Sequence, residues 1–142
     1  MAEIIQAGAI TIKFLLTKAD TDRALTMFEA IVPPGAGVGV PHHHSGWEET
    51  VYGIDGVTTL TVAGKRIEVR AGDAIIIPRG VVHSLKNGTD RPARSLCVIT
   101  PGVLGPEFFR EIAAIAVPGA PPDPKKMAEV MARHGLMPVP NG

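Results

Sequence analysis

The feature that most constrains the fold is a series of short apolar segments separated by glycine-centred turns. Many of the segments are rich in Val, Ile and Thr, and several alternate between apolar and polar residues, as half-buried strands do. Pairs such as Asp55-Gly56 and Asn87-Gly88 separate nearly all of them. Short strands without intervening helices predict an all-β antiparallel sandwich or barrel over residues 1 to about 102. The predicted strands cover residues 10–16, 24–32, 49–54, 57–62, 65–69, 73–78, 81–86 and 93–100.

The pattern changes after the last of these segments. Apolar residues recur at helical spacing over 106–116, which begins with proline at a plausible first helical position. Asp123 can cap a second helix that begins at Pro124 and ends at Gly135. Because about 30 residues cannot sustain a core of their own, we expect residues 103–142 to form a helical extension that packs on the barrel, not a second domain.

Composition excludes several classes of partner. With 142 residues, of which 45% are hydrophobic, the chain can build one core. Its 14 basic and 14 acidic residues are interspersed, so we predict neither a nucleic-acid nor a membrane partner. Lys13 interrupts the N-terminal apolar stretch, and no basic region precedes it, so we predict no signal peptide or membrane span. The single cysteine, Cys97, cannot form an intrachain disulfide, which agrees with the cytoplasmic location that we predict.

Three of the five histidines are consecutive. Successive side chains of a strand point to opposite faces, so His42 and His44 share one face and His43 points to the other. Ser45-Gly46 can reverse the chain, and the next strand then brings Glu48 or Glu49 beside the pair, with only one of the two facing inward.

A second glycine-rich segment, residues 72–87, carries another histidine. His83 follows the turn at Pro78 and Gly80, and it can lie beside His42 and His44 if the sheet closes into a small barrel. Imidazole and carboxylate together suit first-row transition metals, and four protein ligands leave coordination positions open. The alternative is a hydrogen-bonded polar cluster without metal.

The spacing of these residues resembles both motifs of the cupin superfamily. The first, G-x5-H-x-H-x(3,4)-E-x6-G, matches His42, His44, Glu49 and Gly56. The second, G-x5-P-x-G-x2-H-x3-N, matches Gly72, Pro78, Gly80, His83 and Asn87. One position departs from the pattern: Gly37 stands one residue closer to His42 than the first motif requires. We expect this glycine to shape a turn and not to bind metal.

The resemblance implies a double-stranded β-helix, or jelly-roll barrel, that holds one divalent transition metal near one mouth. Its ligands would be His42, His44, His83 and Glu49. A spacing of three residues from His44 also allows Glu48, but the spacing to Gly56 favours Glu49. The metal could be Mn, Fe, Ni, Cu or Zn, of which we favour Mn or Fe.

Further candidates concern the substrate pocket. Trp47 and Tyr52 are the only tryptophan and tyrosine, and either packs in the core, meets a second copy or stacks on substrate. The apolar residues that could line the pocket, or equally belong to the core, are Phe28, Val40, Trp47, Val51, Tyr52, Leu85, Phe108 and Phe109. His43 is expected to be solvated or at an interface, and His134 to interact with the dipole at a helix C-terminus.

A metal centre with open positions indicates catalysis. The resemblance favours a dioxygenase-type oxidoreductase that acts on a small organic molecule. No obvious general base accompanies the ligands, so Glu49 or a metal-bound hydroxide would have to carry the proton, unless proton transfer is not the difficult step. Related folds also support isomerases, decarboxylases and lyases, and a non-catalytic sensor is the remaining alternative. We expect metal occupancy to fall below about pH 6, and we expect a homodimer because such sheets have edges and faces that need cover.

Overall fold

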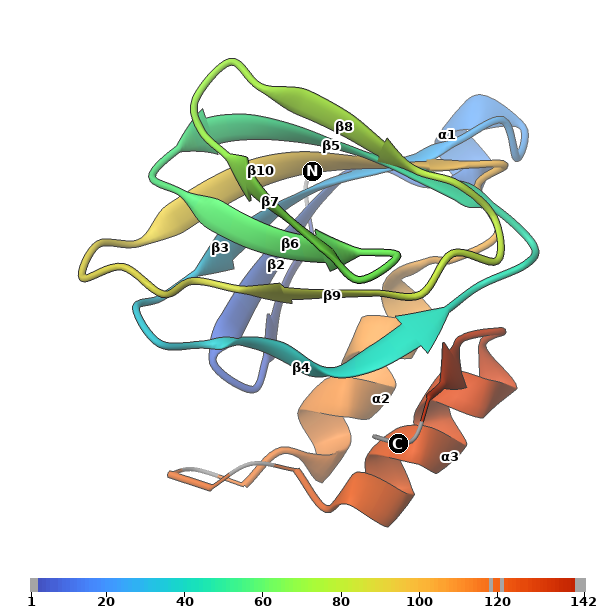
Figure 1. The fold of residues 1–142 in the computed structure, drawn as a ribbon. Coiled ribbons are helices and arrows are strands. Elements are labelled where there is room, and N and C mark those ends of the chain that lie inside the picture. The colour runs from blue at the N-terminus through green and yellow to red at the C-terminus, as the bar shows by residue number, and fades with distance from the viewer. Residues whose placement is uncertain (1–2, 118, 121, 140–142) are drawn as a thin grey trace.

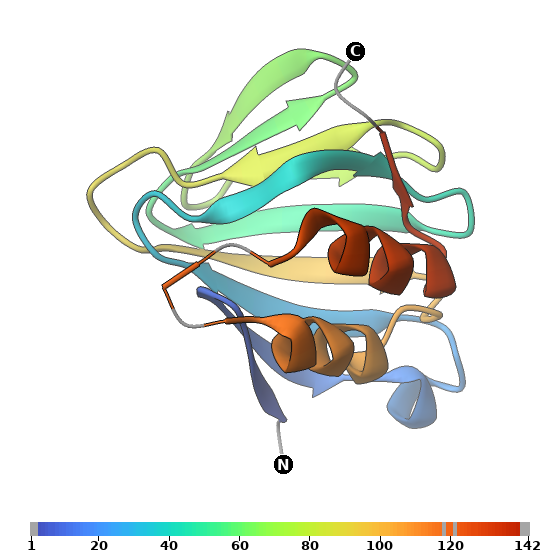
Figure 2. The same cartoon turned by 90° about the horizontal axis from the view of Figure 1, so that it is seen from below.

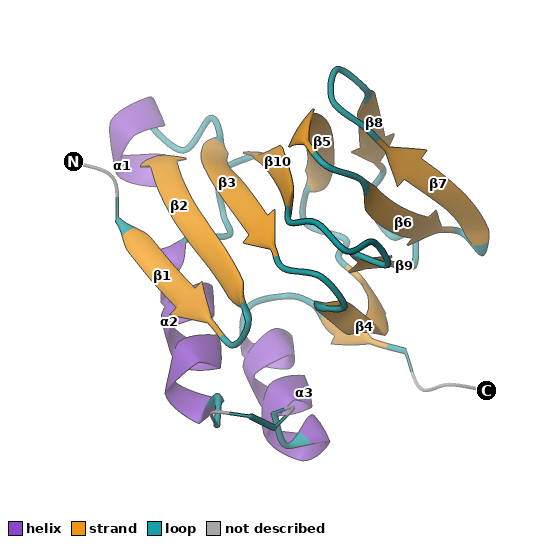
Figure 3. Cartoon of the chain, turned by 90° about the vertical axis from the view of Figure 1, so that its left-hand side faces the viewer, coloured by secondary structure: helices purple, strands orange, loops and turns teal. Residues whose placement is uncertain are grey.

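The structure is a computed structural model that describes residues 3–117, 119–120 and 122–139. Two antiparallel sheets face each other (Figures 1 and 3). Sheet A contains, in spatial order, β1 (Ile4–Ala7), β2 (Ile10–Leu16), β3 (Thr26–Val32), β10 (Ala93–Thr100), β5 (Glu48–Asp55) and β8 (Ala74–Ile77). Sheet B contains β11 (Met137–Pro138), β4 (Gly37–His43), β9 (His83–Lys86), β6 (Thr58–Val62) and β7 (Lys65–Val69). The predicted all-β double-sheet fold is confirmed.

Alternating strands supply the core between the sheets. In β3 every second residue is buried, and in β10 Cys97 and Ile99 are buried while Val98 between them is half-buried. The same alternation in β5 buries Val51 and leaves Tyr52 exposed. Each of these strands therefore has one face toward the opposite sheet, as the period of two predicts.

Four elements differ from the sequence expectations. A one-turn helix, α1 (Lys18–Thr21), joins β2 to β3 within the region predicted to be purely β, and the Asp20 carboxylate accepts a hydrogen bond from the Thr17 amide (2.8 Å). The strands β1 and β11 were not expected. Strand β4 extends back to Gly37 through a glycine- and proline-rich sequence that reads as a loop, because pairing with β9 overrides the weak local propensity.

The two C-terminal helices form where they were predicted. Helix α2 (Pro106–Ile115) and helix α3 (Pro124–Arg133) lie side by side across one side of the barrel (Figure 2). Asp123 caps α3 by accepting a hydrogen bond from the Lys125 amide (2.9 Å). Beyond α3, Gly135 adopts a φ of 83°, and the Leu136 amide donates to the Met131 carbonyl (2.9 Å), which is the Schellman arrangement.

The helices share one core with the barrel. A single hydrophobic cluster joins barrel side chains with buried side chains of the C-terminal region, namely Leu104, Phe108, Ile112, Val130, Met131 and Leu136. Glu111 on α2 binds both Arg133 and His134 at the end of α3. The hydrogen bonds from His134 and Arg133 lower the pKa of the Glu111 carboxyl. His134 therefore has a specific carboxylate partner in addition to the helix dipole. Among the described residues, no helix combines the length and apolarity needed to cross a bilayer.

Candidate metal centre

The candidate ligands come from three strands that meet inside the barrel. His42 on β4 pairs in register with His83 on β9, and His44 follows directly after β4. Glu49 on β5 lies opposite two fully buried residues, Ile99 and Ile77. Glu49 therefore belongs to the inward face of sheet A, and it approaches the histidines of sheet B across the interior.

Three of the four predicted ligands form a compact group. The candidate ligand atoms of His44, Glu49 and His83 all lie within 4.8 Å of one another, and His44 Nε2 is 3.6 Å from Glu49 Oε1. The His42 ring lies near the other two imidazoles: its centroid is 4.4 Å from that of His83 and 6.4 Å from that of His44. The structure thus brings all four residues together, with His44, Glu49 and His83 as the compact group.

Backbone carbonyls fix the orientation of each imidazole. The Nδ1 atoms of His42, His44 and His83 lie 2.9, 3.0 and 2.9 Å from the carbonyl oxygens of Val40, Trp47 and Val81. A carbonyl can only accept, so each Nδ1 carries the proton and each Nε2 presents a lone pair. Sequence reasoning missed these anchors because they are backbone atoms. The shared Val-x-His pattern at 40–42 and 81–83 is the only signal for two of them.

Two of the Nε2 atoms, those of His44 and His83, are buried without a hydrogen-bond partner in the described part of the chain. A buried polar atom without a hydrogen bond is costly, so such atoms call for a ligand or ion that completes them. Two converging imidazole lone pairs and one carboxylate are the donor set of a transition-metal site. The residues present therefore fit a divalent metal ion.

Burial favours the neutral form of His42 and His83. Desolvation lowers the pKa of His42 to about 4, an effect that the hydrogen bond to the Val40 carbonyl only partly offsets. Desolvation also lowers the pKa of His83. Metal ligation requires unprotonated imidazole, so this environment favours the binding form at neutral pH.

The structure distinguishes the two adjacent glutamates. Glu48 is on the outer face of β5, where its carboxylate binds Arg79 (3.3 Å) and the Thr100 hydroxyl (3.5 Å). Glu49 faces the histidines, and its side chain is 17% exposed. The spacing argument that favoured Glu49 agrees with this geometry.

Besides the candidate ligand His83, two residues of the second motif support the site without acting as ligands. The Gly80 amide donates to the His44 carbonyl (2.8 Å), which ties the loop before β9 to the end of β4. The buried Asn87 amide donates to the carbonyls of Val32 (2.9 Å) and Arg91 (2.7 Å). Asn87 therefore holds a loop and does not face the metal centre.

One sequence expectation about the first motif needs correction. Gly37 does not shape a turn, because it begins β4 and pairs with Lys86. A Cβ atom at this position would lie 2.4 Å from the carbonyl oxygen of Leu85. Glycine is needed here for the close approach of two strands.

The predicted pocket residues fall into different environments. Phe28 and Phe108 each pack against Phe109, with ring centroids 5.3 and 5.0 Å apart, and both are buried in the core. Val51 is also core. Tyr52 is 44% exposed on the outer face of sheet A, away from the histidines. Tyr52 therefore points away from the candidate ligands, whereas Phe28, Val51 and Phe108 belong to the buried core.

The remaining pocket candidates lie closer to the ligands. Val40 is 37% exposed and holds His42 through its carbonyl. Trp47 is 3% exposed and stacks on the His44 ring, with centroids 4.5 Å apart and planes 14° from parallel. Leu85 lies opposite Leu60 and packs on the core. His43 lies opposite Met137 of β11, at an interface within the chain.

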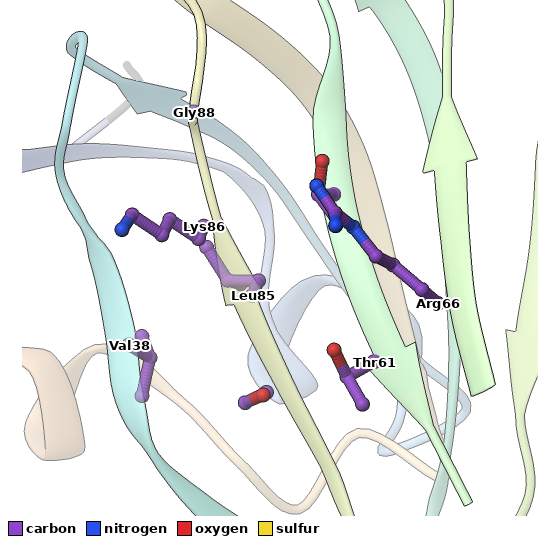
Figure 4. Close-up of a pocket in the computed structure, with 8 residues that line it drawn as sticks. Val38, Thr61, Arg66, Leu85, Lys86 and Gly88 are labelled. Atoms are coloured by element: carbon purple, nitrogen blue, oxygen red, sulfur yellow. The ribbon is translucent and has the colours of Figure 1, made fainter. Parts of the chain in front are cut away.

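A separate hollow lies on sheet B. Its volume is about 480 Å³, and it contains none of the four candidate ligands (Figure 4). Thr61 pairs with both Ser84 and Arg66, next to the inward-facing Leu60, so this hollow is on the outer face of the sheet. Its lining residues are Val38, Thr59, Thr61, Arg66, Ser84, Leu85, Lys86 and Gly88.

Cys97 is not positioned as a nucleophile. It is a buried free cysteine on β10, between Phe28 and Val51 in the strand register. Burial, followed by the charge of Glu49, raises the pKa of its thiol well above the usual value. The reactive thiolate is therefore disfavoured.

Comparison with known proteins agrees with this architecture. The family model for the cupin domain matches residues 28–99, which include all four candidate ligands and the strands that carry them. A double-sheet β-barrel with an interior His/Glu cluster is the class that the fold and site define. The chain belongs to the cupin family.

Three individual proteins show how far the similarity extends. An uncharacterized protein of Methanocaldococcus jannaschii is 34% identical over 76 residues, which are 54% of this chain and 60% of that protein. Quercetin 2,3-dioxygenase of Bacillus subtilis is 27% identical over 100 residues, 70% of this chain but only 29% of that protein. A solved structure from Thermotoga maritima, described as a predicted oxalate decarboxylase, has a TM-score of 0.62 and 28% identity and covers 71% of this chain and 92% of that one. The matched region spans less than two thirds of both curated relatives.

Proposed function

We propose that the protein is a metal-dependent cupin enzyme, a dioxygenase-type oxidoreductase that acts on a small organic substrate. The observation that carries the proposal is the convergence of His44, Glu49 and His83, with two buried Nε2 atoms that have no other partner among the described residues. Catalytic metal sites differ from structural ones in retaining open coordination positions. Three imidazoles and one carboxylate would leave such positions on a five- or six-coordinate ion.

The proposed cofactor is one divalent transition metal per chain, with Mn or Fe favoured. His44, Glu49 and His83 would hold it, and His42, whose ring contacts His83, would complete the set. When bound, the metal would supply Lewis-acid chemistry that polarises substrate oxygens. The buried histidines also exclude bulk water from the ligand side of the site.

Glu49 is the residue that we propose to hold or transfer a proton. Its side chain is partly accessible, whereas His42, His44 and His83 are more than nine-tenths buried and have their Nδ1 protons engaged by carbonyls. A carboxylate within reach of bound substrate can accept a proton at one oxygen while the other stays oriented toward His44. The substrate oxygens would thus meet a single candidate base.

Similarity to quercetin 2,3-dioxygenase supports the oxidoreductase assignment. Because the match covers only 29% of that protein, we do not propose its substrate for this one. Similarity to the Thermotoga maritima structure favours a second candidate, a decarboxylase that acts on a small carboxylic acid. A third candidate is a sensor that binds a ligand without turnover, and isomerase and lyase chemistry are further variants of the same site.

One set of assays separates these candidates. Oxygen consumption is measured with flavonols, β-diketones and catechols, and CO2 release is measured with small dicarboxylates. We expect oxygen consumption that is lost in His44→Ala, with circular dichroism showing that the variant stays folded. CO2 release without oxygen consumption would favour the decarboxylase. Saturable ligand binding without turnover would favour the sensor.

We also propose that two copies form a homodimer through the outer face of sheet A. Met27, Val98 and Ile76 lie in one row across this face, and Leu96 and Tyr52 lie in the next. Thr50 lies between Val98 and Ile76 in the first row. Ile76 is 57% exposed and Tyr52 44%, and exposed apolar side chains on one face can pair with a second copy across a two-fold axis. Light scattering at micromolar concentration should give a dimer for the wild type and a monomer for Ile76→Asp, whereas a wild-type monomer would contradict the proposal.

We assign the protein to the cytoplasm in the same proposal. Its only cysteine is a free thiol, and free thiols are usual in reducing compartments. Subcellular fractionation tests this assignment.

A further inference from the structure

Trp47 holds the candidate ligand His44 at two points. Its carbonyl oxygen lies 3.0 Å from His44 Nδ1, and its indole ring stacks on the imidazole at a centroid distance of 4.5 Å. The indole N–H is buried and has no hydrogen-bond partner among the described residues. Packing, not hydrogen bonding, therefore fixes the orientation of the ring that lies on His44.

The C-terminal segment provides part of that packing. Gly135, directly after α3 and its C-cap His134, lies against the outer edge of the indole, where a Cβ atom would be 3.2 Å from Cζ3 and 3.5 Å from Cη2 of Trp47. At 3.2 Å one of the two groups has to shift. Residue 135 thus contacts the ring that orients the ligand, although it lies outside the 28–99 region that matches the family model.

The same segment also contacts the strand that carries the ligands. In β11, Met137 and Pro138 pair with His43 and His42 of β4. The Val139 amide donates to the Pro41 carbonyl (2.8 Å). Residues 135–139 therefore contact the surroundings of the metal centre at two places, the indole of Trp47 and the backbone of β4.

The start of this segment is anchored in turn. Leu136 is buried in the shared core, and its amide closes the Schellman arrangement at the Met131 carbonyl (2.9 Å). His134 binds Glu111 of α2. The position of Gly135 is thus set by both C-terminal helices, which makes the indole contact a defined feature of the fold.

We propose that Trp47 and Gly135 are positioning residues for His44, so that the C-terminal segment sets the metal affinity of the barrel. The inference rests on the proposed function, in which His44 is a metal ligand. Groups that orient a metal-bound histidine typically change affinity 10–100-fold when they are altered. Neither residue touches the metal or the substrate in this proposal, and each acts through the orientation of the imidazole.

The test measures Co²⁺ binding to the full-length, metal-free protein by calorimetry, together with the visible absorption spectrum of the Co²⁺-loaded form. Gly135→Ala places a Cβ against the indole. Gly64→Ala is the matched control, because Gly64 has a similar positive φ (77° against 83°) but no atom within 4 Å of its Cβ position. Both variants carry the same kind of backbone strain, and only one disturbs Trp47.

We expect Gly135→Ala to bind Co²⁺ about 10–100-fold more weakly and to shift the visible bands, while Gly64→Ala matches the wild type. In a Trp47→Phe background, which removes the contacted edge, Gly135→Ala should have less than about a threefold effect. Two substitutions of Trp47 give a test that does not depend on whether Gly135→Ala folds. Trp47→Phe keeps an aromatic face against His44, so it should bind Co²⁺ more tightly than Trp47→Leu.

The outcomes separate the two levels of the proposal. A wild-type protein that does not bind Co²⁺ would overturn the proposed metal function and the inference with it. Equal Co²⁺ affinity and spectra in the wild type, Gly135→Ala and Trp47→Leu would overturn the inference alone. Equal weakening in Gly64→Ala and Gly135→Ala would also overturn it, because strain and not the indole contact would then explain the effect.

Discussion

Glu49 Oε1 lies 3.6 Å from His44 Nε2, although Glu49 comes from sheet A and His44 follows a strand of sheet B. The distance is too long for a hydrogen bond and is compatible with two ligands of one ion. Glu48, one residue earlier, pairs with Arg79 on the opposite face of the strand. The pleat of β5 therefore decides which of two adjacent carboxylates can bind metal.

The first prediction uses this pair of glutamates as a matched test. Glu49→Gln should weaken metal affinity by more than about a hundredfold, because it removes an anionic ligand and loss of supporting partners alone costs 10–100-fold. Glu48→Gln should leave affinity within about threefold of the wild type, since its partner is a surface arginine and exposed ion pairs contribute little. Calorimetric titration with Mn²⁺ or Fe²⁺ measures both. Equal effects of the two substitutions would contradict the assignment of Glu49.

The second prediction concerns the stability of the metal-free protein in acid. Burial lowers the pKa of His42 to about 4 from its ordinary 6.5. Between these values the unfolded chain holds a proton that the folded chain does not. The contribution of neutral His42 to the free energy of unfolding is therefore fully present above pH 6.5 and is lost as the pH falls from 6.5 through 4. His83 contributes in the same direction.

Urea unfolding after chelator treatment measures this loss, which for His42 amounts to about 2 kcal/mol between pH 7 and pH 4.5. His42→Gln should reduce the pH dependence, and an unchanged profile in that variant would contradict the account. The lowered pKa values of His42 and His83 also move the expected onset of metal release below the value of about 6 predicted from ordinary histidines.

The third prediction tests the close approach of β4 and β9. Gly37→Ala should lower the free energy of unfolding by more than about 2 kcal/mol, because its Cβ would lie 2.4 Å from the Leu85 carbonyl oxygen and the strands that carry His42 and His83 would have to separate. Gly46→Ala is the control, since nothing lies within 4 Å of its Cβ position. Chemical denaturation compares the two. If Gly37→Ala is as stable as Gly46→Ala, the two strands do not pack as described.

The fourth prediction uses the only tryptophan as a reporter. Trp47 stacks on His44 at 4.5 Å, so Co²⁺ or Cu²⁺ bound at His44 should quench most of its fluorescence with saturable, one-to-one behaviour. Zn²⁺, which lacks partly filled d orbitals, should bind without comparable quenching. Quenching that does not saturate, or that persists in His44→Ala, would place the metal elsewhere.

Sequence patterns predicted the parts of the fold that repeat. Segments 10–16, 65–69 and 93–100 match strands to the residue, and in 93–100 the alternation of the sequence coincides with one buried face. Strand β4 escaped full prediction, since its Gly-Val-Gly-Val-Pro sequence has low strand propensity and forms only by pairing with β9. The two-residue strand β11 carries no local signal at all.

The candidate site likewise has residues that the sequence predicts and residues that it does not. Side-chain spacing predicted His42, His44, Glu49 and His83, because ligand geometry is reflected in residue intervals. The carbonyl anchors of Val40, Trp47 and Val81 have no side-chain signature, so only the structure reveals them. The expectation that Tyr52 lines the pocket was wrong. Tyr52 is three residues after Glu49 on β5, so the alternation of the strand places its side chain on the outer face.

The central claim is that His44, Glu49 and His83, together with His42, hold one divalent metal ion. Elemental analysis of the purified protein, before and after reconstitution of the chelator-treated form, tests it most directly. The account predicts one transition-metal ion per chain in the wild type, and far below one in His83→Ala while the fold is retained by circular dichroism. Absence of stoichiometric metal from the wild type under both conditions would contradict the account.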